Sequence, residues 1–153
     1  MRLYLVHHGE AVPAEEDPRR PLTPRGRADA RKVATFAVQR AGARVARVIH
    51  SDKLRARQTA EAWIEELPEV HLVVDERLNP SSDPLALADD IVRAEDDLLL
   101  VGHLPFLRQL VAYLVAGDAN RPVLTYPGGG AVCLERSADG AWSIVWTIAP
   151  ELI

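Results

Sequence analysis

The feature that most constrains the fold is a set of four short apolar segments, each followed by a polar turn. They cover residues 3–6, 45–49, 70–74 and 98–101. Apolar runs of this length, without strict polar alternation, are typical of strands buried on both faces, as in a parallel sheet. The pattern therefore predicts a mostly parallel sheet with helices on its two faces.

Helical patterns fill the intervals between these segments. Thr23 followed by Pro24 predicts the start of the first helix, and Gly42 predicts its end. Further signals are an apolar stripe of helical period over residues 56–67, Asp83-Pro84 at the start of a third helix and Gly117 at the end of a fourth. Strands and helices thus alternate along most of the chain.

The C-terminal part follows a different pattern. Residues 131–136 and 142–148 flank Asp139-Gly140, which predicts an antiparallel hairpin at the edge of the sheet. Together with the alternating elements, this hairpin predicts an α/β fold, a three-layer α/β/α sandwich. With 153 residues and no internal repeat or linker, the chain is expected to form a single domain over residues 1–153.

Charge and cysteine content narrow the choice of partners and compartment. The formal net charge of -4 gives no overall attraction to nucleic acid, so we expect none as a partner. The apolar runs are too short to span a membrane and no signal peptide is evident, which predicts a cytoplasmic protein without membrane contact. Cys133 lies in an alternating strand pattern and is expected to be a packed thiol, with a catalytic cysteine as the alternative.

Polar residues at the ends of the predicted strands form the candidate site. In an open parallel sheet, ligands bind beyond the carboxyl ends of the strands. The residues at such ends are His7, His8, His50, Ser51, Glu76 and His103. We therefore expect segments that are far apart in the sequence to converge on one crevice.

Three residues near these ends suit the transfer of a phosphoryl group, which needs an in-line nucleophile and fixed donors around the phosphoryl oxygens. His8 offers an imidazole nucleophile beside Gly9, which leaves room for close approach to a substrate. Arg55 lies at the start of a helix, and its planar guanidinium group matches phosphate. His103 precedes another helix start and is a second donor.

Four motifs carry a resemblance to a known family. They are Leu5-Val6-His7-His8-Gly9-Glu10, Pro21-Leu22-Thr23-Pro24-Arg25-Gly26, the segment SDKLRARQT over residues 51–59, and Val101-Gly102-His103-Leu104-Pro105. Over its whole length the chain resembles the histidine phosphatase superfamily, and most of all the short SixA-type phosphohistidine phosphatases. The resemblance implies a phosphoglycerate mutase-like fold, with His8 as the phospho-accepting histidine, Arg55 as a phosphate-binding arginine and His103 as the second active-site histidine.

This resemblance leads to an expected activity. We expect a metal-independent phosphatase without a cofactor that removes the phosphoryl group from phosphohistidine on a protein. His7, Arg55 and His103 are the expected substrate-binding residues.

One departure from the family pattern lies beside the expected nucleophile. The family motif reads Arg-His-Gly, whereas this chain has His7 in place of the arginine, so the pocket loses a bidentate cation. A neutral His7 offers one N–H donor, whereas a His7 protonated beside a bound phosphate would give an activity that fades as pH rises. In a third interpretation, His7 merely fills space and phosphate binding is weak.

A second departure concerns the proton donor. Many larger family members carry an acid two residues after the leucine that follows the third strand, but here Leu78 is followed by Asn79 and Pro80. A phosphorylated imidazole leaves more readily than an alkoxide, so the missing acid favours phosphohistidine over sugar phosphates. The candidate donors nearby are Glu10, Glu76 and Asp83, of which Asp83 also suits the role of helix cap.

Other interpretations of the same residues stay open. The chain is alternatively a phosphatase of small phosphorylated metabolites, or a module that binds phosphate or a phosphoprotein with weakened catalysis. A metal-dependent phosphoesterase is less consistent with the sequence, because the adjacent His7 and His8 point to opposite faces of an extended backbone. The glycine-rich residues 127–130 are expected to be a flexible connection, and the charges of Lys53, Arg57, Arg19 and Arg20 to be solvated.

Overall fold

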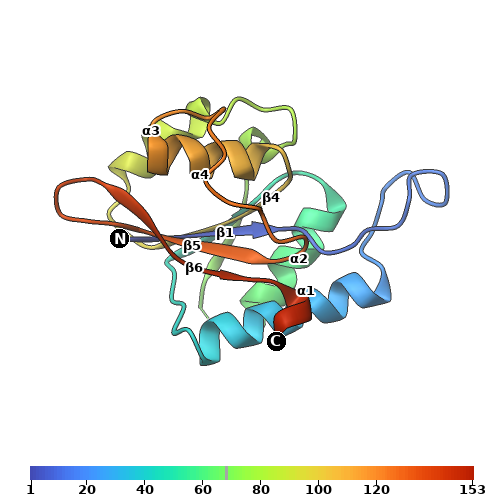
Figure 1. The fold of residues 1–153 in the computed structure, drawn as a ribbon. Helices are drawn as coiled ribbons and strands as arrows, with labels where there is room; N and C mark the ends of the chain where they lie inside the picture. The colour runs from blue at the N-terminus through green and yellow to red at the C-terminus, as the bar shows by residue number, and fades with distance from the viewer. Residues whose placement is uncertain (68) are drawn as a thin grey trace.

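A six-stranded mixed sheet forms the centre of the computed structural model, which describes residues 1–67 and 69–153 (Figure 1). In sheet order, the strands are β3 (His71–Val74), β2 (Arg47–His50), β4 (Leu98–Gly102), β1 (Arg2–His7), β5 (Ala131–Arg136) and β6 (Trp142–Ile148). Strands β1 to β4 are parallel, whereas β5 runs antiparallel to β1 and β6 antiparallel to β5. The predicted edge hairpin is therefore confirmed.

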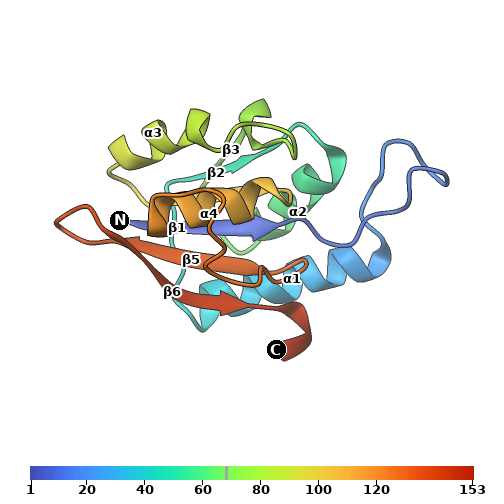
Figure 2. The same cartoon turned by 45° about the horizontal axis from the view of Figure 1, so that its top comes forward.

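Two helices cover each face of the sheet, as Figures 1 and 2 show. Helices α1 (Pro24–Gln39) and α2 (Leu54–Ile64) pack on one face, and α3 (Leu85–Arg93) and α4 (Phe106–Ala116) on the other. Alternate residues of β1 serve the two layers, because Tyr4 packs with the first pair of helices and Leu5 with the second. The three-layer α/β/α sandwich is confirmed.

The sequence signals at the helix ends are also confirmed. The Thr23 side chain accepts a hydrogen bond of 2.9 Å from the Gly26 amide, which caps α1. Gly117 ends α4 with a positive φ of 73°, a conformation that glycine adopts at low cost. At the start of α3, the Asp83 carboxylate accepts a bond of 2.9 Å from the Leu85 amide.

The prediction that residues 70–74 form a strand buried on both faces is wrong. The strand exists, but β3 is the outermost strand and pairs only with β2. Val73 is 40% exposed and Val74 58% exposed. An apolar run of four residues indicates a strand but does not distinguish a central from an edge position, since that depends on the order of strands in the sheet.

Cys133 lies in the core of β5. Its side chain is buried, and burial raises the pKa of the thiol to about 12. This confirms the packed thiol and contradicts the catalytic cysteine. Within the described ranges, no helix is both long and apolar enough to cross a membrane.

Candidate active site

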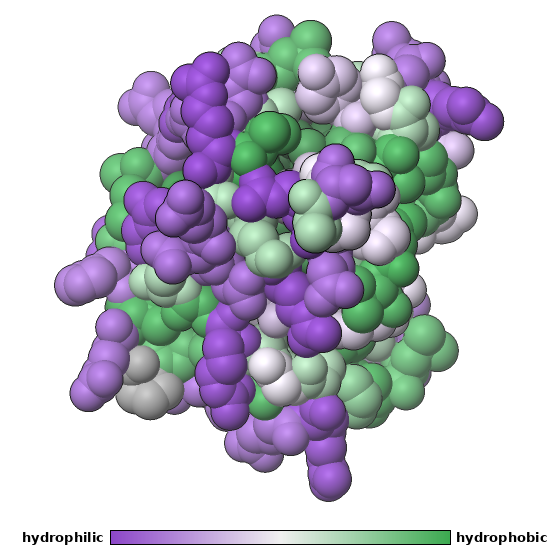
Figure 3. Space-filling view, turned by 90° about the vertical axis from the view of Figure 1, so that its left-hand side faces the viewer, coloured by the Kyte–Doolittle hydropathy of each residue, from purple (hydrophilic) through white to green (hydrophobic). Residues whose placement is uncertain are grey.

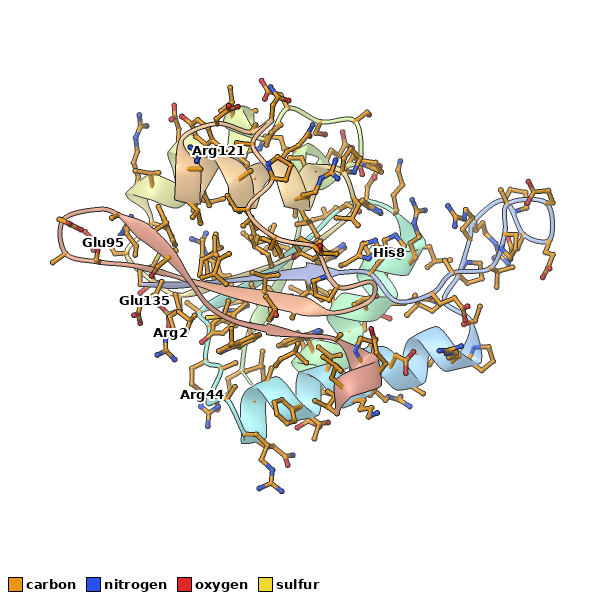
Figure 4. The ribbon with its side chains drawn as sticks, viewed as in Figure 1. Arg2, His8, Arg44, Glu95, Arg121 and Glu135 are labelled. Carbon is orange, nitrogen blue, oxygen red and sulfur yellow. The ribbon has the colours of Figure 1, made fainter. Side chains whose placement is uncertain are left out.

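His8 and His103 meet at the carboxyl ends of two neighbouring parallel strands. His8 follows β1 and lies at the end of the sheet away from Arg2 and Glu135 (Figure 4). Its amide donates a hydrogen bond of 3.2 Å to the carbonyl of Gly102, the last residue of β4. The ring centroids of His8 and His103 are 4.9 Å apart. The pairing of β1 with β4 thus brings together two residues that are far apart in the sequence.

The hydrogen bonds of His8 define its tautomer. Its Nδ1 lies 2.7 Å from the Gly9 carbonyl oxygen, which can only accept, so Nδ1 carries the proton and Nε2 is unprotonated. Burial, followed by the influence of the adjacent His7, lowers the pKa of His8 to about 3. His8 is therefore a neutral imidazole near neutral pH, which is the form that a nucleophile requires.

Arg55, in the first turn of α2, points its guanidinium group at His8. Its Nε donates a hydrogen bond of 3.2 Å to Nε2 of His8. Thr59, one turn later, accepts a bond of 3.1 Å from the Gly9 amide and fixes α2 against the His8 loop. Arg55 has no carboxylate partner among the described residues, and burial lowers the pKa of its guanidinium group. The site thus holds an unpaired cation beside a neutral imidazole.

His103 is held by a residue that sequence reasoning placed at a strand end without giving it a role. The Ser51 hydroxyl lies 2.6 Å from Nε2 of His103, and both side chains are buried. The only described partner for the Ser51 hydroxyl hydrogen is this Nε2, so Nδ1 carries the His103 proton. That Nδ1 is buried without a partner. A buried donor of this kind needs an acceptor, and a phosphoryl oxygen fits.

His50 does not join this group, although it also follows a strand. Its Nδ1 lies 2.6 Å from the carbonyl oxygen of Ser51, the next residue, and therefore donates to it. The strand-end rule places His50 at the correct edge of the sheet, but the described hydrogen bonds do not join its ring to His8, Arg55 or His103.

His7 is a neutral donor rather than a replacement cation. The Gly129 amide donates a hydrogen bond of 3.2 Å to Nδ1 of His7, which leaves the His7 proton on Nε2. Burial, followed by the charge of Arg55, lowers the pKa of His7 to about 4. The structure therefore favours the neutral interpretation of His7. It also gives the glycine-rich segment a role, because one of its amides orients this ring.

Gly9 lies where the His8 loop meets the first turn of α1. A Cβ at Gly9 would lie 2.5 Å from the carbonyl oxygen of Gly26, and a Cβ at Gly26 would lie 2.1 Å from the carbonyl oxygen of Glu10. The two glycines allow the His8 loop to press on the first turn of α1, backbone on backbone. Gly9 thus provides room for the first turn of α1, and it also lines the groove beside His8.

The three candidate proton donors lie in different surroundings. Glu10 lies beside a groove of about 330 Å³ that is also lined by His7 and His8, and its carboxylate accepts a bond of 2.7 Å from the Thr23 hydroxyl. Asp83 caps the first turn of α3 as described above, and Glu76 is exposed in the short helix η1 (Glu76–Leu78) beyond the edge strand. Of the three acids, the structure brings only Glu10 to the His8 groove.

The sequence predicts a solvated charge for Arg20, but the structure places this charge near the site. Its positive charge contributes to the lowered pKa of both His8 and Arg55. No local sequence pattern indicates this proximity, because Arg20 reaches the site only when the loop over residues 11–22 closes on itself. The bridge between Ala11 and Leu22 closes it.

The comparison with family models identifies the chain. Residues 3–80 match the model of the histidine phosphatase superfamily, branch 1. The chain belongs to this superfamily. Its members are phosphatases, and the matched range contains His8 and Arg55. A search of curated proteins found no match.

Solved structures agree with this assignment. The protein histidine phosphatase SixA in complex with tungstate superposes with a TM-score of 0.84 at 25% identity, covering 99% of each chain. A structure from Agrobacterium tumefaciens described as a phosphohistidine phosphatase SixA superposes with a TM-score of 0.78 at 26% identity, covering 97% of each chain. The resemblance to SixA-type proteins in the sequence is confirmed.

A more distant solved structure shares the fold alone. It is a mycobacterial glucosyl-3-phosphoglycerate phosphatase, with a TM-score of 0.74 at 18% identity, covering 97% of this chain and 99% of the other. Phosphatases named for a phosphorylated protein residue and for a small metabolite thus share this architecture, and the fold does not choose between the two substrate classes.

Proposed function

We propose that this histidine phosphatase dephosphorylates phosphohistidine on a protein, through a phosphoryl group carried briefly by His8. The observation that carries the proposal is the geometry of His8 Nε2, an unprotonated nitrogen that faces the Arg55 guanidinium group at 3.2 Å. A neutral nucleophile beside an unpaired cation suits an incoming phosphoryl dianion, because the cation offsets the charge that gathers on the phosphoryl oxygens.

The proposed reaction has two transfers. In the first, Nε2 of His8 attacks phosphorus, the bond from phosphorus to the leaving nitrogen breaks, and that nitrogen takes up a proton. In the second, water attacks the phosphorylated His8, inorganic phosphate leaves, and Nε2 regains its lone pair. Arg55 and the Nδ1–H of His103 donate to the phosphoryl oxygens in both transfers, and Glu10 is the candidate that moves the proton.

The choice of phosphohistidine as substrate rests on which acids of the site could give a proton to the leaving group. Of the three candidate acids only Glu10 lies beside the groove, where its exposed carboxylate accepts a hydrogen bond from the Thr23 hydroxyl. An imidazole leaves with less help from an acid than a sugar alkoxide does. The site is therefore better matched to a P–N bond than to a sugar phosphate ester.

Metal independence is part of the proposal. Among residues 1–67 and 69–153, no three or more histidine, cysteine, aspartate or glutamate side chains gather in a way that would hold a metal ion. We expect activity to survive exhaustive chelation, and activity that returns only with added metal would contradict the proposal.

The test is a metal-free assay of the wild type and His8→Ala on three classes of substrate: a phosphohistidine protein, p-nitrophenyl phosphate and several sugar phosphates. We expect the highest kcat/KM on the phosphohistidine protein and no turnover by the variant. A ranking led by a sugar phosphate would assign the enzyme to small metabolites instead. Binding without turnover, unchanged in His8→Ala, would identify a binding module.

A further inference from the structure

Residues near the C-terminus form one wall of the groove that contains His8. The short helix η2 (Pro150–Leu152) follows β6 and lies beside α1, as Figures 1 and 2 show. Lys32 of α1 donates a hydrogen bond of 3.0 Å from its Nζ to the Pro150 carbonyl, which fixes the start of η2 on α1. Pro150 and Glu151 both line the groove of about 330 Å³ that His8 also lines. A segment remote from His8 in the sequence thus borders the expected nucleophile.

The charged side chains in the lining of this groove differ in their partners. There are three carboxylates, those of Glu10, Asp29 and Glu151, and one guanidinium group, that of Arg25. Glu10 accepts a hydrogen bond of 2.7 Å from the Thr23 hydroxyl, and Asp29 lies 3.7 Å from Arg25, one turn earlier on α1. Glu151 is exposed and forms no ion pair within the described chain. Its carboxylate is therefore available for a charge that a ligand brings.

The two sides of His8 thus favour groups of opposite charge. Arg55 faces His8 and favours the phosphoryl group, whereas the lining of the groove has more carboxylates than cations. A cleft lined mainly by one sign of charge attracts the opposite sign and repels its own. The volume of the groove lies at the lower end of the range for ligand sites, about 300–1,000 Å³, which suits a side chain rather than a folded domain.

We propose that Glu151 is a specificity-determining residue that pairs with a basic side chain next to the phosphohistidine of the substrate. This inference rests on the proposed function, in which the phosphohistidine of a protein binds at His8. With the phosphoryl group at His8, a neighbouring lysine or arginine of the substrate enters the groove and offsets the charge of Glu151. The same carboxylate repels a substrate that carries a second anionic group beside its phosphoryl group.

The first test compares two phosphohistidine peptides that differ only in the residue next to the phosphohistidine, which is lysine in one and glutamate in the other. We expect the wild type to turn over the lysine peptide with a kcat/KM about 3- to 10-fold higher, since one peptide gains a partly exposed charge pair and the other a like-charge contact. Glu151→Lys should bring this ratio to one or below. The same ratio in Glu151→Lys as in the wild type would overturn the inference.

The matched control is Glu95→Lys, which changes the net charge by the same amount outside the groove. Glu95 is exposed and lies at the end of the molecule away from His8 (Figure 4). This variant should keep the ratio of the wild type. An equal loss of the ratio in Glu95→Lys and Glu151→Lys would mean that net charge selects the peptide, and this result would also contradict a role for Glu151.

The second test measures binding of the same peptides by calorimetry in His8→Ala, which lacks the nucleophile. The lysine peptide should bind about 3- to 10-fold more tightly at low salt, with a smaller preference when added salt screens the exposed carboxylate. Adding Glu151→Lys should abolish the preference. A wild type that turns over neither peptide, with the binding preference intact, would refute the proposed function alone. Turnover of both peptides with equal kcat/KM would refute this inference alone.

Discussion

Two arginines at the same edge of the sheet differ in what surrounds them. Arg77, in η1 beyond β3, lies 2.7 Å from Asp75 and 2.8 Å from Asp90, and these carboxylates raise the pKa of its guanidinium group. Arg55, at the start of α2, faces the neutral ring of His8, and burial lowers the pKa of its guanidinium group. Arg77 thus has carboxylate partners in the protein, whereas Arg55 has none among the described residues.

The difference separates a structural charge from a binding charge. A paired, exposed arginine contributes little to stability, and its carboxylate partners already offset its charge. An unpaired, partly buried arginine is costly in the empty protein, and an anion that binds offsets that cost. The opposite end of the molecule, away from His8, shows a mixture of hydrophilic and apolar side chains (Figure 3).

The largest expected effect comes from the nucleophile. His8→Ala removes the Nε2 nitrogen that accepts the hydrogen bond of Arg55, and we expect kcat/KM to fall by about 10³-fold or more. His71→Ala, on the exposed edge strand, is the control and should leave kcat/KM unchanged. Loss of activity in both variants would indicate damage to the fold rather than to the chemistry.

The paired comparison of the two arginines is the next most sensitive test. Arg55→Ala should lower kcat/KM by about 10²- to 10³-fold, the loss seen when one donor to a developing oxyanion is removed. Arg77→Ala should leave kcat/KM unchanged and lower the free energy of unfolding by about 0.2–1 kcal/mol. A chemical denaturation curve and a steady-state assay on both variants check this. If Arg77→Ala reduced activity as much as Arg55→Ala, the distinction between the two charges would not hold.

A smaller effect is expected from the residue that orients His103. Ser51→Ala leaves Nε2 of His103 without its partner, so the ring is free to move its proton from Nδ1 to Nε2. We expect kcat/KM to fall about 10-fold and the ¹⁵N NMR signals of His103 to report the tautomer change. Ser143→Ala, at an exposed position of β6, is the control. Unchanged His103 signals in Ser51→Ala would contradict the positioning role.

The smallest effect concerns pH. The lowered pKa values, about 3 for His8 and about 4 for His7, keep both rings neutral from pH 5 to 8. Protonation removes the His8 lone pair only as pH falls toward those values. The ratio of kcat/KM for wild type to that for His7→Gln should therefore stay constant within about twofold from pH 5 to 8. A ratio that falls steadily as pH rises would mean that His7 acts in its protonated form.

Much of the fold was predictable because it depends on local patterns. The apolar runs predict the strands, and Thr23 and Gly117 predict the helix ends, because each signal acts within a few residues. The exposure of β3 was not predictable, because an apolar run does not indicate whether its strand lies at the centre or at the edge of the sheet. The sequence also brings Glu76 to a strand end, but its side chain is exposed and does not line the groove beside His8.

The site shows the same division. His8, Arg55 and His103 were selected by strand ends and motifs, and the parallel pairing of β1 with β4 brings the two histidines together. The contribution of Ser51 and the approach of Arg20 depend on hydrogen bonds between segments about 50 residues apart and on loop closure. Nothing in the adjacent sequence specifies either.

The central claim is that His8 carries the phosphoryl group, and trapping that intermediate tests it most directly. The enzyme would be mixed with a radiolabelled phosphohistidine protein, quenched in base within milliseconds, digested and mapped by mass spectrometry. We predict an acid-labile, base-stable phosphoryl group on His8, present in Arg77→Ala and absent in His8→Ala. Turnover without label on His8, or with label on another residue, would contradict the account.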